Sequence, residues 1–288
     1  MSHSIRRNLL FAWSILPFLS PAKKRALLAR FTPPERILEA SAAEIAGALS
    51  IRPHEAALVR EPLNLPEVAA LARAESADAI VLGDPDYPPL LAEIADPPLA
   101  LFARGDRRLL SLPALAVVGS RRASTYGLAA ARRIARELVR GGVAVVSGLA
   151  RGIDGAAHRE TLEAGGATLA VLGTGVDLAY PPEHRTLRDR ILECGLVLSE
   201  LPPGTPPRRE HFPVRNRIIA GLAHGVVVVE AGAKSGSLIT ARLALEGGRE
   251  VFAVPGSIFS QTSEGGHRLI QDGAKLLHSM DDLWNELP

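Results

Sequence analysis

The stretch Ala114-Leu-Ala-Val-Val-Gly-Ser-Arg-Arg-Ala-Ser-Thr-Tyr-Gly127 sets a pattern that the later chain repeats. Leu115 to Val118 is short, apolar and partly β-branched, which predicts a strand buried on both faces. Gly119 and two arginines follow at once. Apolar residues from Leu128 to Leu138 then recur three and four positions apart, as on one face of a helix, and Gly141-Gly142 ends it. The unit is therefore a strand, a basic turn and a helix.

This basic turn is a candidate phosphate site. The start of a helix offers free N–H groups and the positive end of its dipole, and two guanidinium groups stand beside it. An ordinary turn with solvated arginines would explain one such unit equally well. Because the pattern returns along the chain, we favour a binding surface.

Strands and helices alternate from residue 115 onward. A helix ends in two glycines directly before a strand at Gly141-Gly142, Gly165-Gly166 and Gly247-Gly248. This alternation, with apolar strands, predicts an α/β fold built on a mostly parallel, doubly wound sheet. We expect the strands at residues 115–118, 143–146, 168–172, 196–198, 226–229 and 251–254, with added strands at 79–82 and 99–103.

The residues that follow the predicted strands should line one rim of the sheet, where ligands of such folds bind. Glycines there let backbone N–H groups approach a ligand, and Arg121, Arg151 and Lys234 add positive charge. The rim segments are Gly119-Ser-Arg-Arg122, Ser147-Gly-Leu-Ala-Arg-Gly-Ile-Asp154, Gly173-Thr-Gly175, Ser199-Glu200 and Glu230-Ala-Gly-Ala-Lys-Ser-Gly-Ser237.

Charge is distributed unevenly along the 288 residues, although the net charge is only +2. Between Gly119 and Arg159 there are eight arginines against one glutamate and one aspartate. Such basic segments in a balanced protein indicate an anionic partner. We expect four of these arginines to face water on a helix surface: Arg132, Arg133, Arg136 and Arg140.

Several kinds of site are excluded by the composition and the motifs. Cys194 is the sole cysteine and no histidine pair has the spacing of a zinc helix, so we expect no metal site. The glycine spacing of a dinucleotide turn and of a Walker loop is missing, so we expect no nicotinamide or ATP cofactor. No stretch is long and apolar enough for a membrane span.

Catalysis has weak support in the sequence. Asp154 and His158 are four positions apart on a predicted helix and could meet as an acid–base pair, but a helix cap with a structural partner is the commoner arrangement. Serines at strand ends lack the glycines of a nucleophile elbow. We therefore expect a protein that is not an enzyme.

The N-terminal residues resemble an export signal because Arg6-Arg7 precedes an apolar run. Pro17 interrupts that run, and Ala22 to Leu28 continues as an amphipathic helix, so we interpret the segment as the first helix of a folded domain in a cytoplasmic protein. We expect residues 1–62 to form a small helical, SAM-like domain of five short helices, and residues 63–288 to form the sheet domain. In small helical domains a glycine-containing hairpin between two helices can bind a DNA backbone. The hairpin from Leu16 to Pro21 has no glycine, which argues against such a role here.

The segment Phe212-Pro-Val-Arg-Asn-Arg-Ile-Ile-Ala-Gly221 is the most specific of the remaining motifs. Arg215, Asn216 and Arg217 open a helix after a proline-rich loop, again at the rim. These side chains suit phosphate oxygens, and Phe212 could stack on a base. Alternatively, one of the two arginines forms a salt bridge with Glu200 or Glu230.

Together these segments resemble the DprA/Smf family of DNA-processing proteins. The resemblance runs from about Ile80 to Leu277. It depends on Val118-Gly-Ser-Arg121, Ser147 to His158, Tyr180-Pro181, Ser199-Glu200, Phe212 to Leu222, Val229 to Ala241 and Val254-Pro-Gly256, with Tyr87-Pro-Pro-Leu90 and Asp96-Pro-Pro98 upstream. Many members continue into a winged-helix-like domain, whereas this chain stops at Pro288, so we expect that domain to be absent or truncated.

The resemblance implies an extended Rossmann-like domain that binds single-stranded DNA without catalysis or cofactor. It also implies a homodimer that coats incoming strands in natural transformation and loads the recombinase RecA onto them. We expect the dimer contact near Ile258, Phe259, Leu269 and Ile270. Carried over by position, the nucleic-acid-binding residues are Gly119, Ser120, Arg121, Ser147, Gly148, Arg151, Phe212, Arg215, Asn216, Arg217, Lys234 and Ser235.

Two other classes remain open at this point. Phosphoribohydrolases use a similar sheet to cleave nucleoside monophosphates, but their Pro-Gly-Gly-x-Gly-Thr loop differs from Glu230 to Ser237 here. The second alternative is a purely structural adaptor. That class would not explain why Arg121, Arg217 and Lys234 are expected at the same rim.

Overall fold

The computed structural model describes residues 2–75 and 78–286. Its helices are Ser2–Ile15 (α1), Pro21–Arg30 (α2), Ala42–Leu49 (α3), Pro53–Arg60 (α4), Pro66–Glu75 (α5), Pro89–Ala92 (α6), Thr125–Arg140 (α7), Ile153–Glu163 (α8), Arg185–Cys194 (α9), His211–Gly221 (α10), Gly236–Glu246 (α11), Glu264–Gln271 (α12) and Asp281–Trp284 (α13). Its strands are Ala79–Val81 (β1), Ala100–Gly105 (β2), Ala114–Val118 (β3), Ala144–Ser147 (β4), Thr168–Val171 (β5), Leu196–Ser199 (β6), Gly225–Val228 (β7), Glu250–Ala253 (β8) and Lys275–Leu276 (β9). Short 3₁₀ helices span Pro34–Leu38, Pro62–Asn64, Arg107–Ser111 and Pro182–His184.

All these strands belong to one sheet, in the order β1-β2-β6-β5-β4-β3-β7-β8-β9. Neighbours from β6 to β9 are parallel, whereas β2 pairs antiparallel with both β1 and β6. In the centre, Leu115 of β3 lies opposite Val145 of β4 and Gly225 of β7. From β3 the chain first adds β4, β5 and β6 on one side and then β7, β8 and β9 on the other. The strand order therefore reverses between β3 and β7. Open α/β sheets bind ligands at this kind of position.

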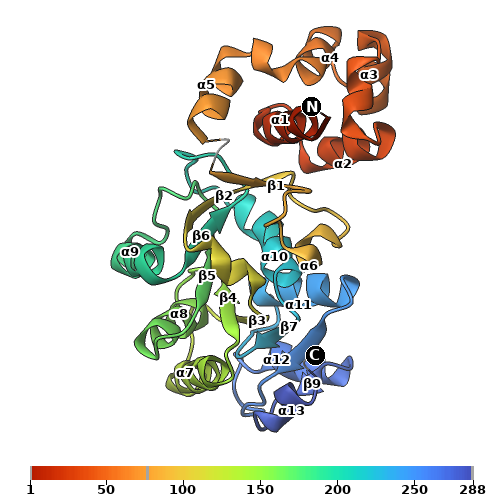
Figure 1. Cartoon of the computed structure of the whole chain (residues 1–288). Coiled ribbons are helices and arrows are strands. Elements are labelled where there is room, and N and C mark those ends of the chain that lie inside the picture. Colours follow the sequence, from red (N-terminus) through yellow and green to blue (C-terminus); the bar gives the residue numbers. More distant parts are fainter. Residues whose placement is uncertain (1, 76–77, 287–288) are drawn as a thin grey trace.

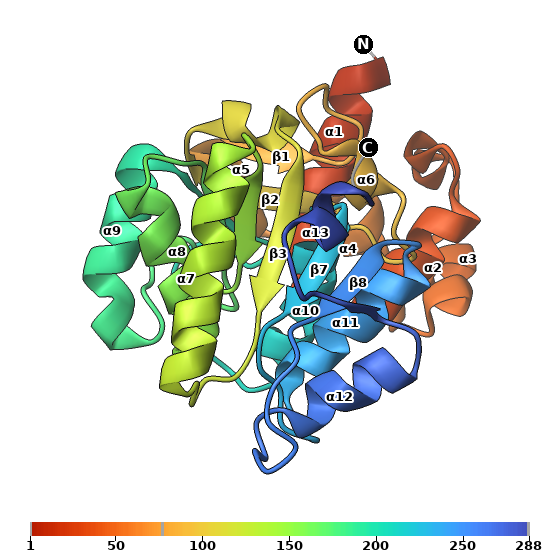
Figure 2. The same ribbon diagram turned by 90° about the horizontal axis from the view of Figure 1, so that it is seen from below.

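Helices cover both faces of the sheet because successive side chains of a buried strand point to opposite sides. Leu115 and Val117 belong to the apolar cluster under α7 and α8, and Ala116 and Val118 belong to the one under α10 and α11. Figures 1 and 2 show α7, α8 and α9 side by side in one layer and α10 with α11 in the other. This arrangement confirms the predicted doubly wound α/β fold.

The helical part, residues 2–75, lies at one end of the molecule beside β1 and β2 (Figure 1). Five short helices precede residue 62, as predicted, when the 3₁₀ helix at Pro34–Leu38 is counted with α1 to α4. The hydroxyl groups of Ser20 and Ser41 accept backbone N–H groups in the first turns of α2 and α3. Helix α5 follows residue 62 and still packs on α1. The boundary between residues 62 and 63 stays a prediction.

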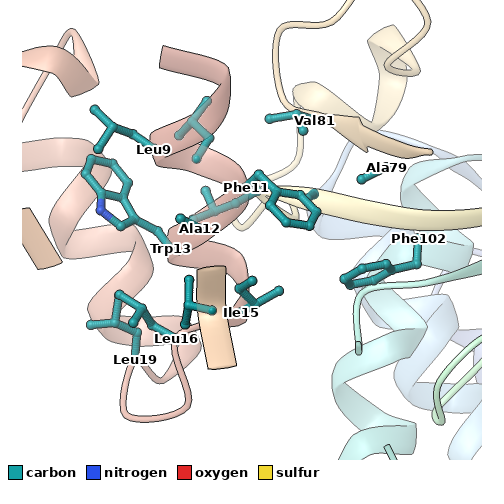
Figure 3. Close-up of a cluster of buried hydrophobic side chains, with 14 of the residues drawn as sticks. Leu9, Phe11, Ala12, Trp13, Ile15, Leu16, Leu19, Ala79, Val81 and Phe102 are labelled. Carbon is teal, nitrogen blue, oxygen red and sulfur yellow. The ribbon is translucent and has the colours of Figure 1, made fainter. Parts of the chain in front are cut away.

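The helical part and the sheet share one apolar core. Buried residues of α1 pack in the same cluster as Val81 of β1 and Phe102 of β2 (Figure 3). The rings of Phe11 and Phe102 meet edge to face, with centroids 5.9 Å apart. Trp13 is also fully buried there, and its indole Nε1–H donates to the carbonyl oxygen of Val59 at 2.8 Å. Burying side chains of this size contributes about 1.5–3 kcal/mol each.

A second contact between the two parts is charged, and we call it the α2 charge cluster: Lys24, Arg25, Asp96, Glu200 and Arg217. The Asp96 carboxylate pairs with Arg25 of α2 at 3.0 Å and with Arg217 of α10 at 3.2 Å, and Arg217 also pairs with Glu200 at 2.8 Å. Burial lowers the pKa of Lys24, whose ammonium group donates to the carbonyl oxygen of Ser14 at 2.6 Å. A cavity of about 380 Å³ lies between α2 and the loop that carries Asp96.

The eight predicted strands are found within two residues of their expected ends. Strand β9 was not predicted, because it has two residues and no apolar run to mark it. The antiparallel direction of β2 relative to β6 was not predicted either. Strand β2 follows β1 through a connection with only the short helix α6 and runs back beside it, as consecutive antiparallel strands do.

Candidate nucleic-acid interface

A pocket of about 1050 Å³ opens at the carboxyl ends of β3 and β7, where the strand order reverses. It is bounded by the turns after these two strands, the first turns of α10 and α11, and the segment before α12. Its lining residues are Val118, Gly119, Ser120, Arg121, Arg122, Ala150, Asp154, Tyr180, Arg209, Phe212, Pro213, Arg215, Asn216, Ile219, Gly232, Ala233, Lys234, Ser235, Gly236, Ser237, Ile239, Thr240, Gln261, Thr262 and Glu264.

The turn after β3 is shaped by two close backbone contacts. A side chain at Gly119 would meet Ile153 at 2.6 Å, so glycine is needed for α8 to pack here. Gly152 has a positive φ of 73°, and a Cβ at this position would meet the carbonyl oxygen of Ser120 at 2.1 Å. The Ser120 backbone N–H donates to the carbonyl oxygen of Glu230 at 2.7 Å, which ties the β3 turn to the β7 turn. The two turns are therefore held as one rigid wall.

Glu230 serves the structure of this wall. Its carboxylate accepts the backbone N–H of Ser124 at 2.9 Å and the hydroxyl of Ser124 at 2.5 Å, at the start of α7. Thr262 donates to the same carboxylate at 3.3 Å. A Cβ at Gly127 would collide with this carboxylate, so the first turn of α7 can approach it only with glycine. Glu230 is therefore occupied and does not pair with the arginines of the pocket.

The start of α11 forms the opposite wall. Ser235 caps the helix, and its hydroxyl also lies 2.7 Å from the hydroxyl of Ser237. Asn216 of α10 donates to the carbonyl oxygen of Gly236 at 3.3 Å and so joins the two helices. Lys234 is exposed just before the helix. Free N–H groups, a helix dipole and an ammonium group together favour an anion here.

Arg215 lies buried at the inner side of the pocket. Its guanidinium donates to the carbonyl oxygens of Gly148, at 2.9 Å, and of Val171, and its Nε has no hydrogen-bond partner among the described residues. Burial lowers the pKa of Arg215 to about 10, with Arg121 adding to that effect and Asp154 opposing it. At neutral pH the group stays charged, so it gives the pocket a fixed positive floor.

Asp154 and His158 support the same floor without forming a pair. The Asp154 carboxylate accepts the N–H groups of Gly148 at 3.1 Å and Ala150 at 3.4 Å, and burial raises its pKa. His158 is fully buried: its Nδ1 lies 2.7 Å from the Thr168 hydroxyl, and its Nε2 accepts the Leu149 N–H at 3.4 Å. Both residues thus hold the turn after β4. Asp154 does so from the first turn of α8, whose N-cap residue is Gly152, so it is not the helix cap expected from the sequence.

Three flat groups stand together at the mouth of the pocket. The Arg121 guanidinium lies over the Phe212 ring, 5.5 Å from its centroid. The Tyr180 ring is tilted by 36° against Phe212, with centroids 5.3 Å apart. A Cβ at Gly173 would meet the Phe212 ring at 2.9 Å, so this glycine lets the ring lie against the backbone. We call Arg121, Phe212 and Tyr180 the stacked triad.

Positive charge dominates the pocket, which holds five cations and two carboxylates. Four of the cations, Arg121, Arg122, Arg209 and Lys234, are exposed, and within residues 2–75 and 78–286 no carboxylate lies within ion-pair distance of them. Exposed cations without a carboxylate partner at a concave site raise the local concentration of anions.

Eight of the predicted binding residues line this pocket: Gly119, Ser120, Arg121, Phe212, Arg215, Asn216, Lys234 and Ser235. Ser147 and Gly148 lie beneath it. The Ser147 hydroxyl donates to the carbonyl oxygen of Val117 at 2.7 Å, and Gly148 accepts from Arg215. Arg151 is exposed beside Tyr180 and is paired with Glu183.

Arg217 is separated from the pocket by the turn of its helix. It follows Arg215 by two positions, so its side chain points to another side of α10. There it is buried in the α2 charge cluster. Burial opposes the charge, but Glu200 and Asp96 outweigh that effect and raise the pKa. The sequence left two alternatives for this arginine, contact with phosphate or a salt bridge. The structure shows a salt bridge with Glu200.

Comparison with known proteins shows the family of this chain. Residues 78–288 match the family model described as DNA recombination-mediator protein A. The chain belongs to this family. It is 46% identical over 226 residues to DNA processing protein DprA of Bacillus subtilis, covering 78% of this chain and 76% of that protein. It is 51% identical over 203 residues to the DprA of Streptococcus pneumoniae, covering 70% of this chain and 72% of that protein.

Two solved structures of the family are similar to this one. The X-ray structure of DNA processing protein A from Streptococcus pneumoniae superimposes with a TM-score of 0.86 at 39% identity and covers 98% of both chains. A structure describing the single-stranded DNA binding mode of DNA processing protein A from Helicobacter pylori has a TM-score of 0.66 at 30% identity. It covers 72% of this chain and 94% of that one. The resemblance found in the sequence is therefore confirmed.

Several lining residues were not among the predicted binding residues. Arg122 was included only in the candidate phosphate site after the first strand, Tyr180 was noted within a motif without a role, and Arg209 precedes α10 in a proline-rich loop. Gln261 and Thr262 reach the pocket because Ala231 donates to the carbonyl oxygen of Thr262 at 2.8 Å. That contact joins segments thirty residues apart, and no local pattern marks it.

Among the described residues no group of three or more His, Cys, Asp or Glu side chains is placed to hold a metal ion. None of the described helices has both the length and the apolar character needed to cross a membrane.

Proposed function

We propose that the protein binds single-stranded DNA without regard to base sequence, through the pocket between β3 and β7. The observation that carries this proposal is the set of exposed, unpaired cations around helix starts and glycine turns. Contacts of these kinds suit phosphate oxygens, which carry no sequence information. The Helicobacter pylori relative described for its single-stranded DNA binding mode supports the same substrate class.

The proposal includes the absence of catalysis. The Ser120 hydroxyl accepts the backbone N–H of Arg122 at 3.1 Å, and those of Ser235 and Ser237 contact each other. A nucleophile needs a base within hydrogen-bond reach, and these hydroxyls are directed elsewhere. Asp154 is likewise engaged by two backbone N–H groups. The pocket is therefore better suited to binding than to bond cleavage.

The decisive test compares labelled oligo-dT with a blunt duplex of the same length by fluorescence anisotropy, at several salt concentrations. We expect tighter binding of the single strand, with an affinity that falls steeply with salt because neutralised phosphates release counterions. Comparable affinity for the two DNAs would contradict the proposal.

Nucleoside monophosphates test the rival enzyme class on the same preparation. Release of free base from any of them would support phosphoribohydrolase activity. We expect no release, and we expect a monophosphate to compete only weakly with oligo-dT because it offers one phosphate rather than several.

We further propose that the protein self-associates through the loop before α12. Ile258 and Phe259 are 82% and 91% exposed and adjacent, beside a hollow of about 630 Å³ that His267 and Arg268 also line. Leu269 and Ile270 of α12 are only half-buried. Neighbouring apolar side chains with this exposure mark a contact surface. Sedimentation at tens of micromolar should show a dimer in the parent and a monomer in Phe259→Asp.

Family membership motivates the remaining part of the proposal, which is loading of RecA onto bound strands in recombination and natural transformation. This role requires access to DNA and RecA, and hence a cytoplasmic location. The test follows RecA assembly on a long single strand by light scattering. The parent should shorten the lag, and Arg121→Ala should not, if strand binding precedes loading. If both proteins shortened the lag equally, RecA loading would not depend on strand binding in the pocket.

A further inference from the structure

Tyr180 is the most exposed aromatic ring of the stacked triad. It is 37% exposed, whereas Phe212 is more deeply set, with the Gly173 backbone and the Arg121 guanidinium against its ring. Among the described residues the Tyr180 hydroxyl has no hydrogen-bond partner, and the ring packs against Phe212. An exposed ring without a polar anchor is available to a flat ligand group.

The position of Tyr180 connects two cationic places on the surface. On one side it touches Phe212, which lies under Arg121. Along the chain, Glu183 follows Tyr180 by three positions, and its carboxylate pairs with the guanidinium of Arg151. Arg151 is exposed and lies outside the pocket lining. A flat surface between two guanidinium groups matches the alternation of phosphate and base along a strand.

We propose that Tyr180 stacks on a base of the bound strand and carries the strand path from the pocket to Arg151. This inference rests on the proposed function. Phe212 then acts as a positioning residue, because it fixes the angle of Tyr180 on one side and the place of Arg121 on the other. Any base has a face that can stack, so the contact adds affinity without sequence preference.

The test uses Tyr180→Leu, which keeps apolar bulk but removes the ring, and Tyr180→Phe, which keeps the ring. Tyr126→Leu is the matched control, because Tyr126 is also exposed but does not line the pocket. Thermal melting of each variant establishes that it is folded. Each binds oligo-dT and an abasic strand of the same length, at several salt concentrations.

We expect Tyr180→Leu to weaken binding of oligo-dT by about 5- to 150-fold, the range that corresponds to about 1–3 kcal/mol for one stacked base. The slope of log affinity against log salt should not change, because no phosphate contact is removed. Binding of the abasic strand should be unaffected. Tyr180→Phe and Tyr126→Leu should bind oligo-dT as the parent does.

A structural role for Tyr180 predicts a different result. If the ring only supports Phe212 and Arg121, Tyr180→Leu weakens the abasic strand as much as oligo-dT and reduces the salt slope. Either that outcome or unchanged binding of oligo-dT overturns the inference while leaving the proposed function intact. Failure of the parent to bind oligo-dT would overturn the proposed function itself.

A second readout is independent of affinity. Oligo-dT with one 5-iododeoxyuridine crosslinks on irradiation to an aromatic ring that stacks on it, and mass spectrometry identifies the site. We expect crosslinks at Tyr180 in the parent and none at Tyr126. Crosslinks confined to Phe212 would assign the stacking contact to that residue and contradict the proposal.

Discussion

The pocket and the α2 charge cluster both contain arginines of the segment Arg215-Asn216-Arg217, yet they use charge in opposite ways. In the cluster, Arg217 is buried and shared between two carboxylates. In the pocket, Arg121 and Lys234 are exposed and the described residues place no carboxylate beside them. A buried cation shared between two carboxylates has little left for a ligand. The difference teaches that burial and pairing, rather than motif membership, separate structural arginines from binding ones.

The contrast between the two regions would be wrong if replacing Arg217 had little effect on the free energy of unfolding. We expect Arg217→Ala to lower the free energy of unfolding by about 3–5 kcal/mol, because Glu200 and Asp96 would be left without their buried partner. Urea unfolding measures this. Arg25→Ala is the matched control: it pairs with the same Asp96 but its side chain is 48% exposed, so it should cost at most about 1 kcal/mol. Equal losses in both variants would contradict the assignment.

For Arg121 we expect the opposite of Arg217: weaker DNA binding with no loss of stability. Arg121→Ala should weaken oligo-dT binding roughly tenfold to a hundredfold, as expected for a charged hydrogen bond, and reduce the salt slope by roughly 0.7. Its melting temperature should match the parent, since Glu200 and Glu230 are occupied elsewhere. Arg121→Lys should restore part of the affinity, because it keeps the charge but loses the planar fork. A lower melting temperature with an unchanged slope would make Arg121 structural.

His158, which is buried beneath the pocket, shows how burial changes the pKa of a side chain there. Burial lowers its pKa to about 3, whereas the unfolded value is about 6.5. Below pH 6.5 the unfolded chain therefore binds a proton that the folded protein excludes, and stability falls as the pH drops toward 3. The loss reaches about 1.4 kcal/mol per pH unit, or about 2 kcal/mol by pH 5.

Urea unfolding at pH 7 and pH 5 measures this loss. Asp154 has a raised pKa and acts in the opposite direction, so the comparison is made between the parent and His158→Gln rather than on the parent alone. The variant should be less stable at pH 7 but less sensitive to acid. Replacement of the exposed His54 by Gln should change neither property, and equal acid sensitivity in all three proteins would refute the prediction.

Lys234 should show the smallest effect. Its ammonium group is exposed and flexible, so we expect Lys234→Gln to weaken oligo-dT binding only a few-fold, within about 1 kcal/mol, while still reducing the salt slope by roughly 0.7. Salt-dependent anisotropy measures both quantities. A loss of affinity without a change of slope would mean that Lys234 does not meet a phosphate.

Local patterns were enough to predict the parallel centre of the sheet, but not β9 or the direction of β2. Short apolar runs, several of them preceded by paired glycines, identify strands buried on both faces, and the residues after Val118 and Val228 then had to meet at one rim. Arg215 and Arg217 show where this reasoning ends. Both open the same helix, and their different surroundings depend on Asp96 and Glu200, which come from distant segments. Local patterns do not identify partners that lie far apart in the sequence. Gln261 and Thr262 at the pocket were missed for the same reason.

The edge-to-face contact of Phe11 with Phe102 has a consequence for how the protein unfolds. If the helical part detached, Val81 and Phe102 would lose the apolar cover that α1 provides, and this face of β1 and β2 would be exposed to water. Partial unfolding is therefore penalised on both sides of the contact. We expect one cooperative transition in calorimetry, with matching calorimetric and van't Hoff enthalpies, so that the helical part and the sheet behave as a single thermodynamic unit.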